Sequence, residues 1–137
     1  MERRKFFSLL GAGAAVLVAD RTLVSCAKNA TSPYGGPSNV DFTLDLTNAA
    51  YAGLKNKGGF AYNNGIIIAH TSSDTYVAVS DVCTHQGCVV QFNSNAFVCP
   101  CHFSTFALNG SVTGGPAPAS LTKYNTMLTG NSLRVYS

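Results

Sequence analysis

The sequence predicts an all-β domain, built as a small sandwich or as stacked antiparallel sheets. Three observations favour this class. Apolar and polar residues alternate over short runs, as they do on a strand with one buried face. Turn-forming residues separate these runs at short, regular intervals. Beyond residue 38 the 3.6-residue period of an amphipathic helix is absent, and the remaining length suits one compact domain, 39–137.

The expected strands follow one another along this domain. Residues 40–46, "VDFTLDL", alternate apolar and polar side chains, and 59–70 read as a hairpin because Asn63-Asn64-Gly65 favours a tight turn. Further strands are expected at 75–83, 89–92 and 96–98, and a last hairpin should turn at Gly130-Asn131. We expect Phe92, Phe97 and Tyr76 in the core, and His70 pointing outward at a strand end.

The first 26 residues predict an export signal. Adjacent arginines at 3–4 precede an uncharged apolar run at 6–19, which is shorter than the about 20 residues that span a bilayer. The arginine pair resembles a twin-arginine signal, and "LVSC" at 23–26 resembles a lipobox that would make Cys26 an acylated N-terminus. An uncleaved N-terminal anchor is the alternative. Both interpretations place the domain on the periplasmic side, close to a membrane.

Residues 27–38 predict a flexible linker, because they are small, polar and rich in Gly and Pro. From Cys26 onward, basic and acidic residues nearly balance. The domain therefore lacks the clustered basic face of a nucleic-acid-binding protein, and no nucleic-acid partner is expected. We also find no nucleophile–base pair, no paired catalytic carboxylates and no phosphate-binding glycine loop.

Two short clusters contain four of the five cysteines and two of the three histidines. The first is Cys83-x-His85-x2-Cys88, and the second is Cys99-x-Cys101-His102. Two facing loops of this kind would supply a Cys2His2 ligand set and one cross-loop disulfide. A binuclear iron–sulfur site and structural zinc both remain open, although zinc sites usually begin with Cys-x2-Cys. A c-type haem is excluded, because "CPCH" has one residue too few between its cysteines.

The two clusters resemble the cluster-binding boxes of Rieske [2Fe–2S] proteins. The boxes are "CTHQGC" at 83–88 and "CPCHFS" at 99–104, and "GGPAPASLTKY" at 114–124 resembles the proline loop that covers the cluster in that family. The resemblance implies Rieske-type antiparallel stacked sheets with a cluster-binding subdomain of two loops. It also implies a [2Fe–2S] cofactor.

Carried over by position, the resemblance implies a ligand set, a disulfide and a lid. The ligands would be Cys83 and Cys99 on one iron and His85 and His102 on the other; the disulfide would join Cys88 and Cys101; the lid would include Gly115, Pro116 and Pro118. Two thiolates leave the oxidised cluster neutral. The family's potential is therefore high, roughly −150 to +300 mV against about −400 mV for plant-type clusters.

Four further residues would tune the cluster if the resemblance holds. Ser104 occupies the position whose hydroxyl bonds a bridging sulfide in the high-potential branch. Phe106 stands where that branch usually has a tyrosine bonding a ligand thiolate, so the potential should be lower. Gln86 replaces the leucine common in quinol-oxidising members, and Gly87 should allow a tight turn with its amide facing the cluster.

The resulting functional hypothesis is one-electron transfer by a membrane-tethered subunit of a respiratory oxidoreductase that oxidises quinol. Phe103 makes "CHFS" similar to the small subunit of arsenite oxidase, so a subunit of a molybdenum oxidase is the alternative. A zinc-stabilised binding module is a third. The expected partners are a b-type or c-type cytochrome or a molybdopterin subunit, with quinol as the small-molecule donor.

Overall fold

The computed structural model describes residues 35–137. The export signal, acylation at Cys26 and most of the expected linker lie outside the described residues. Within 35–137 no helix is both long enough and apolar enough to cross a bilayer.

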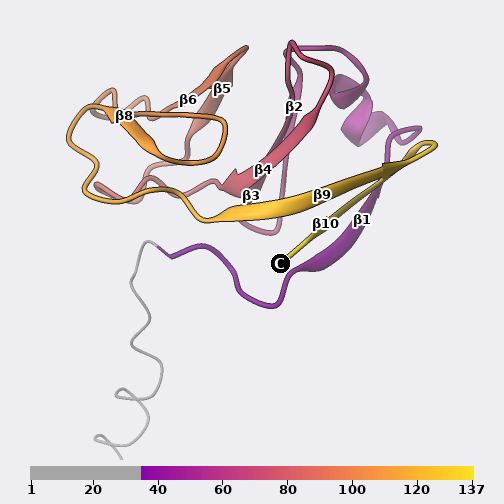
Figure 1. Cartoon of the computed structure of the whole chain (residues 1–137), viewed down its shortest axis with the longest axis horizontal. Coiled ribbons are helices and arrows are strands. Elements are labelled where there is room, and N and C mark those ends of the chain that lie inside the picture. Colours follow the sequence, from indigo (N-terminus) through magenta and orange to yellow (C-terminus); the bar gives the residue numbers. More distant parts are fainter. Residues whose placement is uncertain (1–34) are drawn as a thin grey trace, which may run out of the picture. The chain divides into compact units, whose positions relative to one another are not determined.

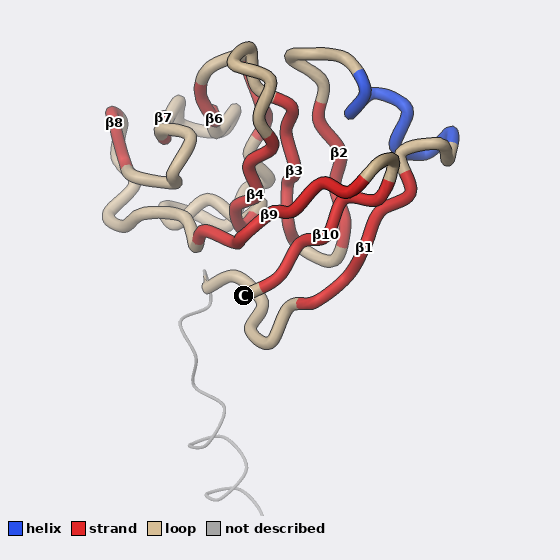
Figure 2. The backbone as a smooth tube through the Cα atoms, turned by 45° about the vertical axis from the view of Figure 1, so that its right-hand side comes forward, coloured by secondary structure: helices blue, strands red, loops and turns tan. Residues whose placement is uncertain are grey.

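The described chain forms two antiparallel sheets, which confirms the all-β prediction (Figure 1). The larger sheet has the strand order β1 (Asp41–Asp45), β10 (Ser132–Tyr136), β9 (Lys123–Thr129), β4 (Tyr76–Ser80), β3 (Ile66–His70) and β2 (Phe60–Asn63). The smaller sheet has the order β5 (Gln91–Asn93), β6 (Ala96–Val98), β7 (Thr105–Phe106) and β8 (Val112–Gly114). We call residues 82–122, which carry the smaller sheet between β4 and β9, the small lobe. Figure 2 shows that much of this lobe is loop.

Strand β3 lies between two hydrophobic cores, which explains why all five of its residues are buried. Side chains alternate across a strand. Ile66 and Ile68 accordingly pack with Leu44 and Leu133 in the first core, which is formed mainly by side chains of the larger sheet. Ile67 and its neighbour Ala69 belong to the second core, which extends into the small lobe. Strand β3 thus connects the core of the larger sheet with the core that extends into the small lobe.

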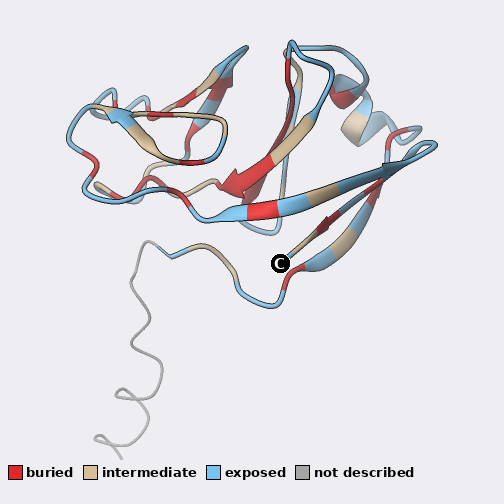
Figure 3. Cartoon of the chain, in the orientation of Figure 1, coloured by how far each residue is buried: buried red, intermediate tan, exposed pale blue. Residues whose placement is uncertain are grey.

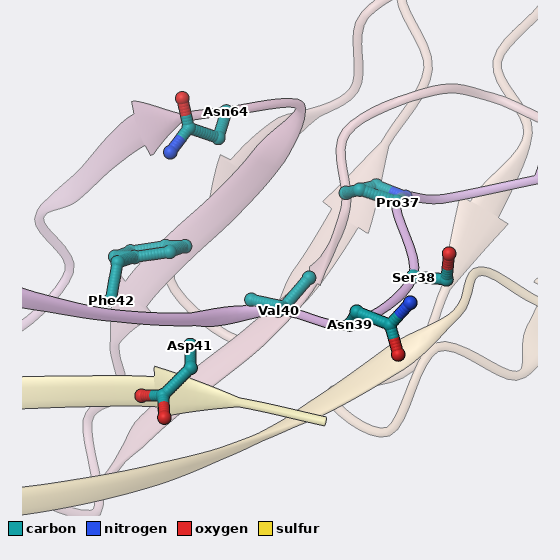
Figure 4. A pocket seen from close by; sticks show the side chains of 7 residues that line it. All are labelled: Pro37, Ser38, Asn39, Val40, Asp41, Phe42 and Asn64. Carbon is teal, nitrogen blue, oxygen red and sulfur yellow. The ribbon is translucent and has the colours of Figure 1, made fainter.

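Both hairpins expected from the sequence are confirmed. Asn64 and Gly65 turn β2 into β3 with φ values of 51° and 80°, the left-handed conformation that an Asn-Gly turn adopts readily. Gly130, at φ 59°, turns β9 into β10. Asn64 also lines a pocket at the entry to β1, together with Pro37, Ser38, Asn39, Val40, Asp41 and Phe42 (Figure 4). No residue of the two cysteine clusters lines this pocket.

Three elements were not expected from the sequence. The 3-10 helix η1 (Ala49–Lys55) is capped at its N-terminus by Asn48, whose side chain accepts a hydrogen bond from the Ala50 amide. Strands β7 and β8 have two and three residues, too few for an alternating pattern to be recognised.

The outward orientation expected for His70 is wrong. Its residue surface is only 5% exposed, because η1 covers this end of β3. Nδ1 lies 2.8 Å from the Leu54 carbonyl oxygen, and Nε2 lies 2.8 Å from Asp74 Oδ1. The ring stacks on Tyr76 with centroids 4.4 Å apart. Phe92 and Phe97 are buried as expected, whereas Tyr76 is half-buried.

Replacing His70 with leucine is expected to lower the free energy of unfolding by about 1–2 kcal/mol, because the contacts of its ring nitrogens with the Leu54 carbonyl and the Asp74 carboxylate are lost. The hydrogen bond from His70 lowers the pKa of Asp74, and the Lys57 ammonium adds to this shift. A carboxylate whose pKa is lowered by folding contributes its full stabilisation at pH values above its pKa in the unfolded chain. That contribution is lost as the pH falls through its pKa in the folded protein. In urea titrations the H70L variant should therefore lose part of the acid-side dependence of stability, and an unchanged profile would contradict the contact.

Candidate metal centre

The two cysteine clusters form adjacent loops of the small lobe. The first loop, 83–88, follows β4, and the pairing of Val82 with Val89 closes its base. The second loop, 99–104, connects β6 to β7, whose pairing joins Val98 to Thr105. The β5–β6 hairpin connects the two loops and brings them together, as the sequence spacing suggested.

The two loops share one backbone pattern. In the first, the Cys83 amide donates to the Cys88 carbonyl at 2.8 Å, and the Gly87 amide donates to the Cys83 carbonyl at 2.9 Å. In the second, the Cys99 amide donates to the Ser104 carbonyl at 2.8 Å, and the Phe103 amide donates to the Cys99 carbonyl at 2.9 Å. The fifth residue of each loop is left-handed, with φ 77° at Gly87 and 60° at Phe103. This conformation suits glycine but costs another residue about 1–2 kcal/mol.

A disulfide joins the loops through Cys88 and Cys101, with a Cα–Cα distance of 6.4 Å. This pairing is the one that the resemblance implied. The Sγ atom of Cys99 lies within 4.8 Å of both disulfide sulfurs. The bonded sulfurs have no thiolate to offer a metal, so their contribution is to hold the two loops together.

The remaining thiols of the loops, Cys83 and Cys99, are buried and belong to no disulfide with a described residue. Burial raises the pKa of Cys83, and the adjacent Cys99 adds to the increase. The Cys83 thiol therefore resists ionisation where no positive charge compensates the thiolate. A bound cation would supply that compensation and convert both thiols into thiolate ligands.

The two cluster histidines face the same region. The rings of His85 and His102 are perpendicular, with centroids 4.8 Å apart. The Nδ1 atom of His85 is buried and has no hydrogen-bond partner among the described residues. Buried polar atoms almost always have a partner, so an unpaired imidazole nitrogen in a loop that also carries a buried thiol fits a metal ligand. The donor set of two sulfurs and two nitrogens fits a [2Fe–2S] cluster of the Rieske type.

Ser104 is fully buried at the end of the second loop. Its Oγ accepts a hydrogen bond of 3.1 Å from the Ala117 amide. Since the hydroxyl acts as an acceptor in this contact, its own hydrogen is free to donate to a group held between the loops. This orientation fits the sulfide-bonding role expected for Ser104.

The proline segment contacts both loops. A Cβ atom added to Gly115, at φ 80°, would lie 2.5 Å from Ser104 Cα and 3.0 Å from the Phe103 carbonyl oxygen. On the other side, Thr84 Oγ1 donates a 2.6 Å hydrogen bond to the Ala119 carbonyl. Pro116 and Pro118 are exposed on either side of buried Ala117. The segment therefore has the geometry of a lid.

Sequence reasoning missed two residues that position this site. Thr84, between two expected ligands, holds the lid. Tyr62 on β2 donates a 2.8 Å hydrogen bond to the Val90 carbonyl and so connects the larger sheet to the segment between the first loop and β5. A hydroxyl inside a ligand motif is a usable signal for Thr84, whereas nothing in the sequence pairs residues 62 and 90. Phe106 is fully buried in the same core as Cys83 and Cys99, and Gln86 is exposed.

Comparison with known proteins identifies this arrangement. The family model described as "Rieske [2Fe-2S] domain" matches residues 46–125. The cytochrome b6-f complex iron-sulfur subunit of Chlorobaculum thiosulfatiphilum is 32% identical over 134 residues, covering 96% of this chain and 74% of that protein. The corresponding subunit of Prochlorococcus marinus is 35% identical, covering 88% and 76%.

Solved structures agree with the fold. The crystal structure of the cyanobacterial plasma membrane Rieske protein PetC3 from Synechocystis PCC 6803 is 35% identical, with a TM-score of 0.53, covering 64% of this chain and 95% of that one. A chain from the complex of oxygenase and ferredoxin in carbazole 1,9a-dioxygenase has a TM-score of 0.57 at 15% identity, which supports the fold alone. Since the family model spans more than half of the sequence and relatives above 30% identity cover most of it, the chain belongs to the Rieske [2Fe–2S] protein family.

Proposed function

We propose that this chain is the Rieske subunit of a membrane-bound cytochrome complex that oxidises quinol, with Cys83, Cys99, His85 and His102 as the cluster ligands. Electron transfer through a Rieske [2Fe–2S] cluster is the function that the family assignment gives. The quinol-oxidising complex, the four ligands and the membrane tether are the parts that we add. One observation carries the quinol-oxidising complex: the relatives that align with nearly the whole chain are named as cytochrome b6-f complex subunits.

A [2Fe–2S] cluster held here would supply one-electron redox chemistry, and the thiolates of Cys83 and Cys99 would leave its oxidised form neutral. The residues of the chain hold, orient and shield it. The disulfide between Cys88 and Cys101 fixes the distance between the two ligand loops. Ser104 presents a free hydroxyl hydrogen to the site, and Gly115 allows the lid to lie directly against the second loop. The cytochrome partners expected from the sequence fit this role.

The membrane tether is the part of the proposal that rests on sequence alone. The apolar run at 6–19 and the lipobox-like segment ending at Cys26 support attachment at the N-terminus on the periplasmic side. Mass spectrometry of the native N-terminus would distinguish acylated Cys26 from an uncleaved anchor.

A molybdenum oxidase subunit remains the second candidate, favoured by one observation. Phe103 occupies a left-handed position in the second loop, and "CHFS" was the feature that resembled the small subunit of arsenite oxidase. The family assignment favours iron and sulfide over zinc, so the zinc-stabilised module has no supporting observation.

Deletion of the chromosomal copy tests the proposed function. Membranes of the deletion strain should lose quinol-dependent reduction of cytochrome c, and the full-length chain should restore it. The His102→Ala variant should not restore it, whereas Asn125→Ala, an exposed position on β9, should. Undiminished quinol oxidation after deletion would refute the function, and loss of arsenite oxidation in its place would establish the second candidate.

Replacing Phe106 with tyrosine is expected to raise the reduction potential. Phe106 is fully buried in the core that contains Cys83 and Cys99, so an added hydroxyl would lie in a low-dielectric region, and the family resemblance places it within reach of a ligand thiolate. A hydrogen bond to a ligand sulfur stabilises the reduced, more negative cluster. Protein-film voltammetry measures the shift, with Phe92→Tyr in the same core as the control. A potential that stays the same or falls in the F106Y variant would contradict the role assigned to this position.

A further inference from the structure

Both ring nitrogens of His70 face oxygen atoms that accept hydrogen bonds. Nδ1 lies 2.8 Å from the Leu54 carbonyl oxygen, and Nε2 lies 2.8 Å from Asp74 Oδ1. The Leu54 carbonyl also accepts a 2.9 Å hydrogen bond from the Tyr76 hydroxyl. Because a carbonyl oxygen has no hydrogen to donate, the contact with Leu54 requires a proton on Nδ1.

The contact with Asp74 requires a proton on Nε2 as well. The Asp74 side chain is 67% exposed, and the Lys57 ammonium lies 3.9 Å from its Oδ2. The hydrogen bond with His70 lowers the pKa of Asp74, and the Lys57 charge adds to this shift. Near neutral pH the carboxylate is therefore ionised and can only accept hydrogen bonds. A neutral imidazole carries one N–H and one bare nitrogen, so two acceptors at 2.8 Å require the doubly protonated, positively charged ring.

The surroundings of the ring compensate this charge, although β3 is buried along its whole length (Figure 3). Asp74 supplies the counter-charge, and the Tyr76 ring stacks on the imidazole with centroids 4.4 Å apart, an arrangement that attracts a cation. Burial, and then the charge of Asp74, raise the pKa of Tyr76, so its hydroxyl stays neutral. The other titratable side chains on the elements packed against β3 form no hydrogen bond or ion pair with the ring; they are Tyr51 and Lys55 on η1 and Tyr62 on β2.

The turn that the ring holds through Asp74 also contacts the small lobe. The Thr71 amide closes this turn, 71–75, by donating a 2.8 Å hydrogen bond to the Thr75 carbonyl. Ser72 Oγ donates a 2.9 Å hydrogen bond to Asn95 Oδ1 at the tip of the β5–β6 hairpin, and this hairpin connects the two ligand loops. A contact that orders the turn therefore also acts on a segment that joins both loops.

We propose that His70 is a pH-operated latch, whose doubly protonated ring holds η1 and the turn at 71–75 against the end of β3. When the ring loses one proton, a bare nitrogen faces an acceptor, and one of the two contacts opens. A histidine in the unfolded chain loses this proton near a pH of about 6.5. The stabilisation from the ring is therefore fully present below that pH and is lost as the pH rises through the titration of the folded ring. Acid opens the latch as well, through protonation of Asp74, so the contact is strongest between the two titrations.

Nitrogen-15 NMR of the oxidised, full-length holoprotein tests the protonation directly. At pH 7 both ring nitrogens of His70 should have the chemical shift of protonated nitrogen, each coupled to its own hydrogen. Their signals are assigned by their absence in the His70→Gln variant. Hydrogen exchange then follows the latch as the pH is raised. Once the ring loses a proton, the amide of Asn56 or of Thr71 should exchange roughly tenfold faster beyond the intrinsic effect of pH, as expected for the loss of one charged hydrogen bond.

Two variants separate the latch from a general loss of stability. In Asp74→Asn the carboxamide can turn its NH2 group towards a bare Nε2, so a neutral ring satisfies both contacts. This ring should carry one proton at pH 7, and the two amides should show no step as the pH rises. Lys57→Gln removes only the charge beside the carboxylate, from a pair in which both side chains are more than half exposed, and should keep both ring protons.

Three results would overturn the proposal. The first is a wild-type ring with an unprotonated nitrogen at pH 7, and the second is an unchanged double protonation in Asp74→Asn. The third is amide exchange that follows only the intrinsic effect of pH while the ring titrates, which would show that the ring holds neither segment. None of these measurements involves electron transfer, so each of these results would leave the proposed function intact.

Discussion

Replacing Gly115 with alanine is expected to lower the free energy of unfolding by about 3 kcal/mol and to release the lid from the second loop. The new Cβ would lie 2.5 Å from Ser104 Cα and 2.9 Å from the Ser104 amide nitrogen, so the backbone must shift. The left-handed φ of 80° adds a strain of about 1–2 kcal/mol. Because Ser104 is the residue displaced, the reduction potential should change together with stability. Thermal unfolding and voltammetry of the same preparation measure both.

Gly130 provides the matched control for this substitution. It is also left-handed, at φ 59°, but a Cβ added there meets nothing within 4 Å. The Gly130→Ala variant should therefore show only the backbone cost, about 1 kcal/mol, with an unchanged potential. Equal losses of stability in the Gly115→Ala and Gly130→Ala variants would mean that the lid does not pack closely against the second loop.

Removing the disulfide with the double change Cys88→Ala and Cys101→Ala is expected to cost about 3 kcal/mol of stability and to shorten the lifetime of the bound cluster. The bond links residues 13 apart in sequence, and closing a loop of this size restricts the unfolded chain by about that amount. It also holds two loops that otherwise meet mainly through the β5–β6 hairpin. Urea unfolding gives the stability, and the decay of the visible absorbance at elevated temperature gives the cluster lifetime.

Two controls make the disulfide result interpretable. Wild-type protein treated with a thiol reductant under anaerobic conditions should approach the behaviour of the double variant. The Gln86→Ala variant changes an exposed side chain of the same loop and should leave both measurements unchanged. A double variant that retains its cluster as long as the wild type would show that the bond has no part in holding the loops together.

Short stretches of sequence predicted the features that depend on neighbouring residues alone, namely the two hairpin turns and the two cysteine boxes. The Asn64-Gly65 turn and the hairpin at Gly130 follow from backbone preferences that two residues decide. The two cysteine boxes could be located because ligand residues are chemically distinctive and closely spaced. The partner of Cys88 came from the family resemblance, because four cysteines alone allow three pairings.

The remaining features depend on contacts between distant parts of the chain. His70 is buried because η1 covers the end of β3, and no local pattern brings Leu54 next to residue 70. The hydrogen bond from Tyr62 to Val90 and the one from Thr84 to Ala119 likewise join segments whose proximity only the folded chain creates. The left-handed conformation of Phe103 was unexpected, because an aromatic residue is an unusual choice where glycine fits best.

The most direct test of the central claim is nitrogen-sensitive pulsed EPR of the reduced, full-length protein, combined with metal analysis. Two iron atoms per chain, a rhombic signal of low average g and hyperfine coupling to two imidazole nitrogens are expected, with one coupling lost in a His102→Cys variant. Bound zinc without this signal, or an iron–sulfur signal lacking nitrogen coupling, would contradict the account.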